Sequence, residues 1–211
     1  MGTARVMETF AGAEEWVPPR GGLPSVQAAL QECRGCDLWR EATQAVPGEG
    51  PRQARMMLVG EQPGEVEDKA GQVFVGPAGR LLDKALEAAG IDRTAVYLTN
   101  AVKHFRFETR GKRRIHKTPA VSHIVACGPW LARELQIVKP ELVVILGSVA
   151  ARALLGTGFK VTEQRGRPVE LSNGTAAVAT VHPSSVVRSE EYRRDFALLV
   201  DDLRAANALL S

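Results

Sequence analysis

The chain has 211 residues, a length that suits one domain with a full hydrophobic core. Its net charge is only +3, so any binding of nucleic acid has to come from local clusters of positive charge. No apolar run is long enough to cross a bilayer, and the N-terminus lacks the apolar core of a signal peptide, so a cytoplasmic protein without membrane contact is expected.

Short apolar runs alternate with amphipathic segments along the chain. Residues 1–22 contain paired prolines and glycines and are expected to form an irregular arm, whereas residues 23–211 are expected to form one domain. The pattern predicts strands at residues 56–59, 96–100, 141–146 and 175–181, and helices at residues 25–33, 80–89, 118–138, 148–155 and 189–210. Residues 161–171 are expected to form a hairpin-like excursion. Buried strands that alternate with helices favour an α/β fold with a parallel sheet covered on both faces.

Polar residues follow three of the predicted strands. Glu61 follows the first strand, Asn100 ends the second, and His182 follows the last and opens the tetrapeptide H-P-S-S. Open α/β sheets place their sites at the carboxyl ends of the strands, so these side chains predict a site at one edge of the sheet. Phe74 lies between small residues and is either a core residue or a platform for stacking on a base. No G-x-G-x-x-G or phosphate-binding loop is present, which argues against a dinucleotide or ATP enzyme.

The densest positive run of the chain covers residues 110–119, R-G-K-R-R-I-H-K-T-P. We expect it to form a basic loop between the second strand and the long helix. A basic loop on a rigid scaffold suits the binding of a polyanion. The alternative is a solvated charge run, and a histidine among arginines, such as His116, is commonly a phosphate contact.

The three cysteines suggest a metal site. Cys33 and Cys36 form a C-x-x-C motif, which zinc, redox and iron–sulfur sites share, and Cys127 stands alone. In a cytosolic protein a disulfide is the poorer expectation. Three cysteines leave a closed site one ligand short, and histidine is the usual substitute. His123 is one candidate, because it precedes Cys127 by four residues and shares its helical face.

Taken together, the motifs resemble the uracil-DNA glycosylase superfamily. The motifs that carry the resemblance are G-E-Q-P-G-E-V-E-D after a strand, V-F-V-G-P-A-G, Y-L-T-N-A-V-K, A-C-G-P-W-L, V-I-L-G and V-H-P-S-S. They are most similar to the iron–sulfur branch (family 4), and K-R-R-I-H resembles the X-type members, which link themselves covalently to DNA. The resemblance covers about residues 25–211. It implies a three-layer α/β/α sandwich with a central four-stranded parallel sheet.

The resemblance also implies DNA that contains uracil, single- or double-stranded, as the substrate, and base-excision DNA repair as the process. It implies a 4Fe-4S cluster, whose family cysteines match Cys33, Cys36 and Cys127. The remaining family cysteine matches His104, which is therefore favoured over His123 as the fourth ligand. A Cys3His set leaves zinc as the alternative metal. We expect a monomer, because no unusually apolar surface helix stands out.

The pocket residues are carried over in the same way. Gln62 stands where many members have an aspartate and Gly64 where some have a tyrosine, so Glu61 is the carboxylate that remains in the pocket. Phe74 resembles the residue that stacks on the flipped uracil, and Asn100 the one that reads its edge. The remaining matches are His182, a donor to uracil O2; Ser184 and Ser185, phosphate contacts; and Arg114, which positions the loop or a phosphate.

The X-type resemblance gives His116 the role of nucleophile. A neutral imidazole would attack C1′ of the sugar after uracil leaves, with Glu61 accepting or orienting its proton, and the protein would react once. The neighbouring charges of Arg113, Arg114 and Lys117 are expected to oppose protonation of His116. One alternative is an ordinary glycosylase that activates water and turns over many times. Another is a metal-containing module that binds nucleic acid without catalysis.

Overall fold

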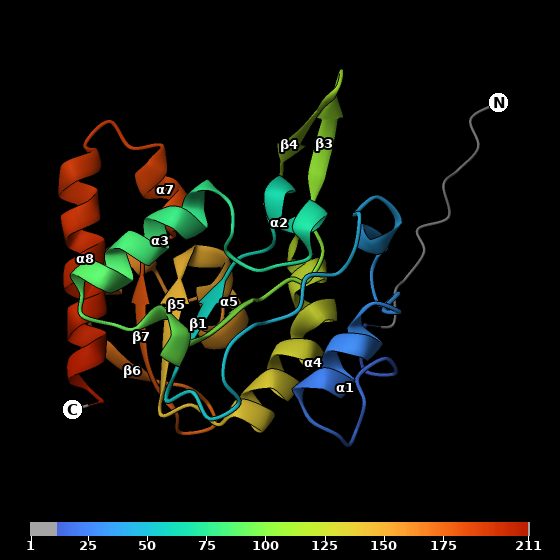
Figure 1. Cartoon of the computed structure of the whole chain (residues 1–211), viewed down its shortest axis with the longest axis horizontal. Helices are drawn as coiled ribbons and strands as arrows, with labels where there is room; N and C mark the ends of the chain where they lie inside the picture. The colour runs from blue at the N-terminus through green and yellow to red at the C-terminus, as the bar shows by residue number, and fades with distance from the viewer. Residues whose placement is uncertain (1–11, 211) are drawn as a thin grey trace.

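The computed structural model describes residues 12–210, which form a mixed five-stranded sheet covered by helices on both faces (Figure 1). The strand order is β2-β1-β5-β7-β6. The strands are β1 Met56–Gly60, β2 Tyr97–Asn100, β5 Leu142–Leu146, β6 Pro168–Glu170 and β7 Ala176–Thr180. The predicted α/β fold is confirmed, and its four predicted strands run parallel. The sheet has one strand more than expected, because β6, in the predicted excursion, pairs antiparallel with the edge of β7.

Helices close both faces of the sheet. The α-helices are α1 Leu23–Leu30, α2 Glu65–Ala70, α3 Pro77–Ala88, α4 Val121–Val138, α5 Gly147–Leu155, α6 Val161–Gln164, α7 Pro183–Val187 and α8 Tyr192–Ala208, with 3-10 turns η1 Asp37–Arg40 and η2 Arg93–Ala95. Helices α3 and α8 cover one face, and α4 and α5 cover the other (Figure 1). No helix within residues 12–210 is both long and apolar enough to cross a membrane.

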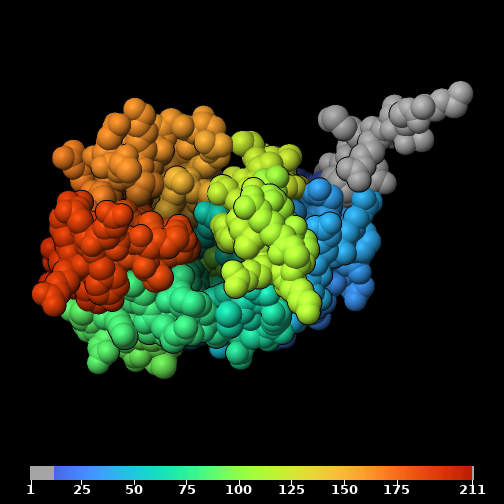
Figure 2. Space-filling view, turned by 90° about the horizontal axis from the view of Figure 1, so that it is seen from above, coloured from blue at the N-terminus to red at the C-terminus, as the bar shows by residue number. Residues whose placement is uncertain are grey.

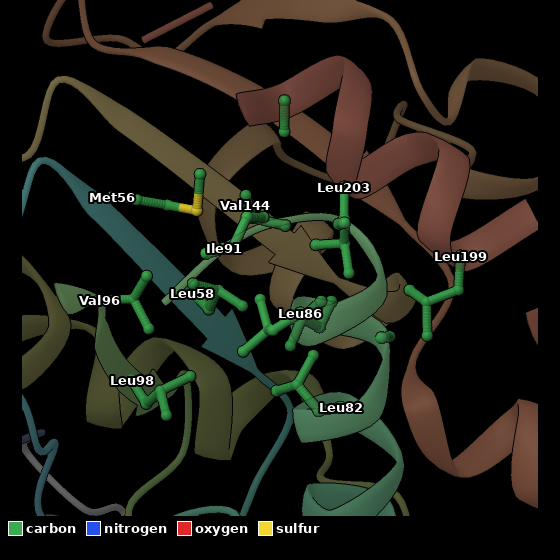
Figure 3. Packing of buried hydrophobic residues seen from close by; sticks show 14 of the residues in the cluster. Met56, Leu58, Leu82, Leu86, Ile91, Val96, Leu98, Val144, Leu199 and Leu203 are labelled. Carbon is green, nitrogen blue, oxygen red and sulfur yellow. The ribbon is translucent and has the colours of Figure 1, made fainter. Parts of the chain in front are cut away.

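Alternation along the buried strands divides the core into two layers. Leu58 packs with α3 and α8, whereas its neighbours Met57 and Val59 belong to the cluster on the opposite face, because successive strand residues point to opposite sides. Figure 3 shows Leu58 among Leu82 and Leu86 of α3 and leucines of α8. Burial of one such leucine stabilises the folded state by about 1.5–3 kcal/mol. This packing therefore holds in place the sheet edge on which the site is built.

The five predicted helices all begin at residues other than those predicted, and two of the differences affect the site. The long helix α4 begins at Val121, not Thr118, and its first turn is capped by His123, whose Nδ1 accepts the Ala120 N–H at 3.1 Å. Helix α1 follows Gly22 and ends at Leu30, so Ser25 is not its cap. The side chain of Cys33 is therefore presented by the turn after the helix, not by the helix itself.

Most of the basic run lies in a β-hairpin, so the prediction of a loop without strands was wrong. Strand β3 Phe107–Arg110 pairs antiparallel with β4 Arg113–His116, and Gly111 forms the turn at φ +59°. The two-residue turn and the pairing of Phe107 with His116 define its register. The hairpin projects from the body of the molecule beside α2 (Figure 1), so its last residue, His116, lies at the base of the projection.

Part of the predicted N-terminal arm lies outside the described residues. Within residues 12–22, Ala13 is buried and donates its backbone N–H to the carbonyl oxygen of Ala126 in α4 at 2.9 Å, and Trp16 packs on the same cluster. The start of the domain at residue 23 stays a prediction, although this stretch is attached to the body.

Candidate functional site

A cavity of about 300 Å³ opens at the carboxyl edge of the parallel strands. Figure 2 shows the hollow between the yellow-green hairpin, the blue-green segment after β1 and the orange-red segment around α7. Eight of the predicted site residues line it, namely Glu61, Gln62, Gly64, Phe74, Asn100, His116, His182 and Ser184. The carboxyl ends of β1, β2 and β7 share one edge and bring Glu61, Asn100 and His182 together, whereas Phe74 comes from the loop before α3 and His116 from the hairpin.

Another cavity, of about 490 Å³, lies between α4, α5 and the β6–β7 turn. Its wall contains one ionisable side chain, Lys139, beside apolar and small polar residues. It offers no acid–base pair, whereas the cavity at the strand ends contains two histidines and several carboxylates. The latter is therefore the candidate active site.

Three buried polar atoms in this cavity have no hydrogen-bond partner among the described residues. They are Oε1 of Glu61, Oδ1 of Asn100 and Nε2 of His182. Buried polar atoms are nearly always paired, so three unpaired ones around one cavity indicate a place for a polar ligand. Two of the atoms are oxygen acceptors, and the third is an imidazole nitrogen whose protonation its neighbours decide.

His182 is held as a neutral hydrogen-bond donor. Burial is the main cause that lowers its pKa to about 4, and the nearby His116 and Arg188 add to the effect. Its Nδ1 accepts the backbone N–H of Ser184 at 3.2 Å and lies 2.8 Å from the Ser184 hydroxyl oxygen. The single ring proton is therefore assigned to Nε2, which faces the cavity without a partner.

Glu61 has the properties of a general base. Burial raises the pKa of its carboxyl group to about 7, against the opposing influence of Arg188. The carboxylate is thus available near neutral pH and more basic than an exposed one. The prediction that Glu61 remains as a pocket carboxylate is consistent with this geometry, although Glu65 and Glu67 also line the cavity.

Phe74 forms an aromatic wall. Its side chain is buried, and its ring centroid lies 6.4 Å from that of His182 at an interplanar angle of 29°. Phe74 thus belongs to the core cluster and also lines the cavity, and its role as a platform for stacking on a base stays a prediction.

His116 reaches the cavity from the base of the hairpin. Its Nε2 lies 3.5 Å from Oε1 of Glu61 and 2.9 Å from Nε2 of Gln62. Its pKa is lowered, as expected, but the causes are burial and then Arg188, not its neighbours in the basic run. The imidazole is about half exposed (49%) and neutral, so it is available to a bound molecule.

Gln62 connects the hairpin to the end of β1. Its Nε2 donates to the carbonyl oxygens of Arg106 (3.2 Å) and Lys117 (3.0 Å), and its Oε1 accepts the Arg106 N–H at 2.9 Å. Gln62 therefore fixes both strands of the hairpin at their base, in addition to lining the cavity.

Arg114 is not among the residues that line the cavity. Its Nη1 lies 2.7 Å from Oδ2 of the fully buried Asp68, and its guanidinium lies 4.9 Å from the ring centroid of Phe107. This supports the positioning role foreseen for Arg114 and leaves a phosphate contact untested. Ser185 also lies outside the lining, with its hydroxyl donating to the His182 carbonyl oxygen at 2.7 Å.

Several residues of the cavity were not predicted from the sequence, and two of them are Glu67 and Arg188. Glu67 is buried in α2, and Arg188 follows α7 at the rim. Arg188 lowers the pKa of Glu61, His116 and His182. The sequence signal for Arg188 was its position six residues after His182, because a short helix after the strand brings that position back to the same cavity opening.

The residues expected to hold an iron–sulfur cluster are gathered in the cluster beside α1 and α4. Cys33, Cys36 and Cys127 are free, buried and packed together. Burial raises the pKa of Cys36 to about 11 and of Cys127 to about 12, so both are protonated thiols unless a metal binds them. Within residues 12–210, no three histidine, cysteine or acidic side chains are close enough to share one metal ion. A 4Fe-4S cluster at these residues, with zinc as the alternative metal, therefore stays a prediction.

The two histidines considered as the fourth cluster ligand differ in the hydrogen bonds that their rings form. Both ring nitrogens of His123 are engaged, one with the Ala120 N–H and the other with Asp37 Oδ1 at 2.9 Å. His104 is buried, no hydrogen bond to its ring is formed within the described chain, and burial lowers its pKa to about 4. A neutral, unpaired imidazole is what metal ligation requires, so the geometry favours His104.

Comparison with known proteins identifies the family. Residues 47–204 match the family described as the uracil DNA glycosylase superfamily. A type-4 uracil-DNA glycosylase of Thermotoga maritima is 35% identical over 188 residues, which cover 88% of this chain and 93% of the relative. The type-4 enzymes of Sulfurisphaera tokodaii and Pyrobaculum aerophilum are 32% and 33% identical, over 89% and 82% of this chain and 84% and 89% of their own. The chain belongs to the uracil-DNA glycosylase superfamily.

Proposed function

We propose that the protein is a uracil-DNA glycosylase, which removes uracil from DNA in base-excision repair. The observation that carries the proposal is the set of three unpaired atoms of Glu61, Asn100 and His182 beside the ring of Phe74 in one cavity. Family membership and the names of the relatives support the same substrate.

The unpaired atoms complement the polar edge of uracil. Uracil offers an acceptor at O2, a donor at N3 and an acceptor at O4. Nε2–H of His182 can donate to O2, and Oδ1 of Asn100 can accept from N3–H while its amide nitrogen donates to O4. Cytosine has no proton on N3, so Oδ1 of Asn100 would face a second acceptor and the base would bind poorly.

The same contacts assist bond cleavage. When the bond between C1′ and N1 breaks, the electron pair leaves with uracil, and negative charge is shared with O2. The donor on His182 stabilises this charge, and loss of one such donor typically costs about 2.7–4 kcal/mol. The base has to leave the helix to reach the cavity, and Phe74 provides the surface for it to stack on.

Hydrolysis completes the reaction in the reading that the relatives favour. Water attacks C1′ of the cationic sugar, and Glu61 accepts its proton, which leaves an abasic site and lets the enzyme turn over. The pKa of Glu61, raised to about 7 by burial, suits this transfer. The relatives named type-4 uracil-DNA glycosylases support turnover better than covalent capture.

His116 carries a second candidate, covalent capture of the DNA. Its neutral imidazole lines the cavity next to Glu61, where a nucleophile for C1′ would stand. Gln62 Nε2 has two hydrogens but three acceptors in reach, namely two backbone carbonyl oxygens and Nε2 of His116. Both hydrogens can therefore be satisfied by the carbonyls, which frees the histidine lone pair to bond to C1′. Such a protein would react once.

We also propose that Cys33, Cys36, His104 and Cys127 hold a 4Fe-4S cluster. It would brace the segments around α1 and the end of β2 rather than supply chemistry to the cavity. The four side chains are buried, and the histidine is neutral and unpaired, which fits a ligand set.

One denaturing gel tests the proposal and separates the two candidates. The protein is mixed with a labelled oligonucleotide that contains one uracil, and the products are denatured with heat and detergent. Hydrolysis predicts no shifted band and strand cleavage after alkali. Covalent capture predicts a shifted band that needs uracil and is lost in His116→Ala. If neither the shifted band nor alkali-dependent cleavage is observed, the result contradicts the proposed function and favours a module that only binds nucleic acid.

A further inference from the structure

The backbone of Phe74 adopts a conformation that side chains rarely occupy. Its φ is +55°, and Lys139 is the only other residue besides glycine with a positive φ in the described chain. Left-handed backbone at a bulky residue persists only where neighbouring groups hold it. The ring of Phe74 forms the wall of the cavity, so whatever holds this backbone also sets the place of the wall.

Glu67 holds this segment from the side of α2. Its Oε1 accepts the backbone N–H of Gly76, two residues after Phe74, at 2.8 Å. Its Oε2 abuts the loop after β1, since a Cβ on Gly64 would lie 2.7 Å from it. The buried carboxyl group of Glu67 therefore lies between two loops that both contribute to the cavity lining, next to the N-terminus of α3.

Gly79 closes the segment from the other side. A Cβ at Gly79 would lie 1.8 Å from the carbonyl oxygen of Phe74, so the first turn of α3 packs directly on the Phe74 backbone. The Phe74 backbone is therefore in close contact with Gly79, and the chain just after it is held by the hydrogen bond from the Gly76 N–H to Glu67.

We infer that Glu67 is a positioning residue, which holds Phe74 where the excised base stacks. The inference rests on the proposed excision of uracil. Glu67 acts as a hydrogen-bond acceptor for Gly76, so a neutral acceptor of the same size preserves the function, and an apolar side chain of similar length does not. The effect passes through Phe74, so it disappears once the aromatic ring is gone.

The test compares Glu67→Met, which removes the acceptor and keeps the volume, with Glu67→Gln, which keeps the acceptor. Uracil release is measured in single turnover over a range of DNA concentrations, with thermal unfolding as the fold control. We expect Glu67→Met to lower the saturating rate about tenfold, with the half-saturating DNA concentration changed less than about twofold, because DNA contacts outside the base are intact. Glu67→Gln is expected to stay within about threefold of the natural protein.

A double-mutant cycle with Phe74→Leu identifies the path of the effect. We expect Glu67→Met to slow the Phe74→Leu protein less than twofold. If Glu67→Met slows uracil release by the same factor with and without Phe74→Leu, the two effects are independent and the inference is overturned. Equal reductions of the rate in Glu67→Met and Glu67→Gln would also overturn it. Amide exchange at Gly76 gives a second readout that needs no activity, and it should accelerate in Glu67→Met alone; unchanged exchange would also refute the inference. A natural protein that releases no uracil would instead refute the proposed function.

Discussion

Replacement of Arg114 by alanine should release the hairpin from the body. Arg114 pairs with Asp68 at 2.7 Å, and the side chains of the two residues are 18% and 0% exposed. Removal of one partner of a buried pair typically costs 3–5 kcal/mol, because the other charge stays buried. Asp68 keeps two hydrogen bonds from Thr43, so the lower end, about 3 kcal/mol, is expected here. This corresponds to a roughly 100-fold larger population of the opened hairpin.

Limited trypsin digestion measures that population, since the hairpin contains several basic cleavage sites. When opening is fast relative to cleavage, the cleavage rate follows the open fraction. Arg113→Ala is the matched control, because it also removes one cleavage site but lies exposed on the outer part of the hairpin. We expect hairpin cleavage to accelerate by roughly two orders of magnitude in Arg114→Ala and little in Arg113→Ala. Equal rates in the two variants would refute the idea that Arg114 anchors the hairpin.

Three further predictions concern the chemistry of the cavity and the cysteine cluster. The rate of excision should increase as pH rises through about 7, because Glu61 loses its proton there and becomes the carboxylate. Glu61→Gln should excise slowly, and its rate should not depend on pH in this range. An unchanged pH profile in the variant would exclude Glu61 as the base. His182→Ala should slow uracil release at saturating DNA by about 10²–10³-fold, and a loss confined to DNA affinity would contradict its role as a donor to O2. His104→Ala should lose iron and absorbance near ~400 nm while His123→Ala retains both, and the reverse result would assign the ligand to His123.

The strands of the sheet could be predicted because they are short, apolar and buried on both faces. Strand β5, L-V-V-I-L, is buried at every position. Strand β6 has only three residues, P-V-E, and no such signal. It forms because β7 offers an unpaired edge, which is a property of the assembled sheet and not of the local sequence.

The hairpin was missed for a different reason. Its residues alternate in burial only weakly, and five basic side chains in the run suggested a basic loop. Its folding depends on contacts from distant residues, among them Gln62, which is 54 positions from His116, and Asp68, which is 46 positions from Arg114. Local sequence patterns do not predict such long-range pairs.

The candidate site was predictable to the extent that parallel strands impose it. Glu61, Asn100 and His182 follow or end strands that share one edge, so their proximity follows from the topology. The role of Glu67 could not be foreseen, because it depends on how the short helix α2 directs its side chain, whereas the spacing of Arg188 from His182 was a signal that the prediction did not use.

Free uracil is the product that tests the central claim most directly. The protein is incubated with three oligonucleotides that differ at one position, which is uracil, thymine or cytosine. The released bases are quantified by chromatography. Both hydrolysis and covalent capture predict that uracil is released from the first oligonucleotide and that no base is released from the others. Absence of free uracil, with the oligonucleotide bound but intact, would contradict the account.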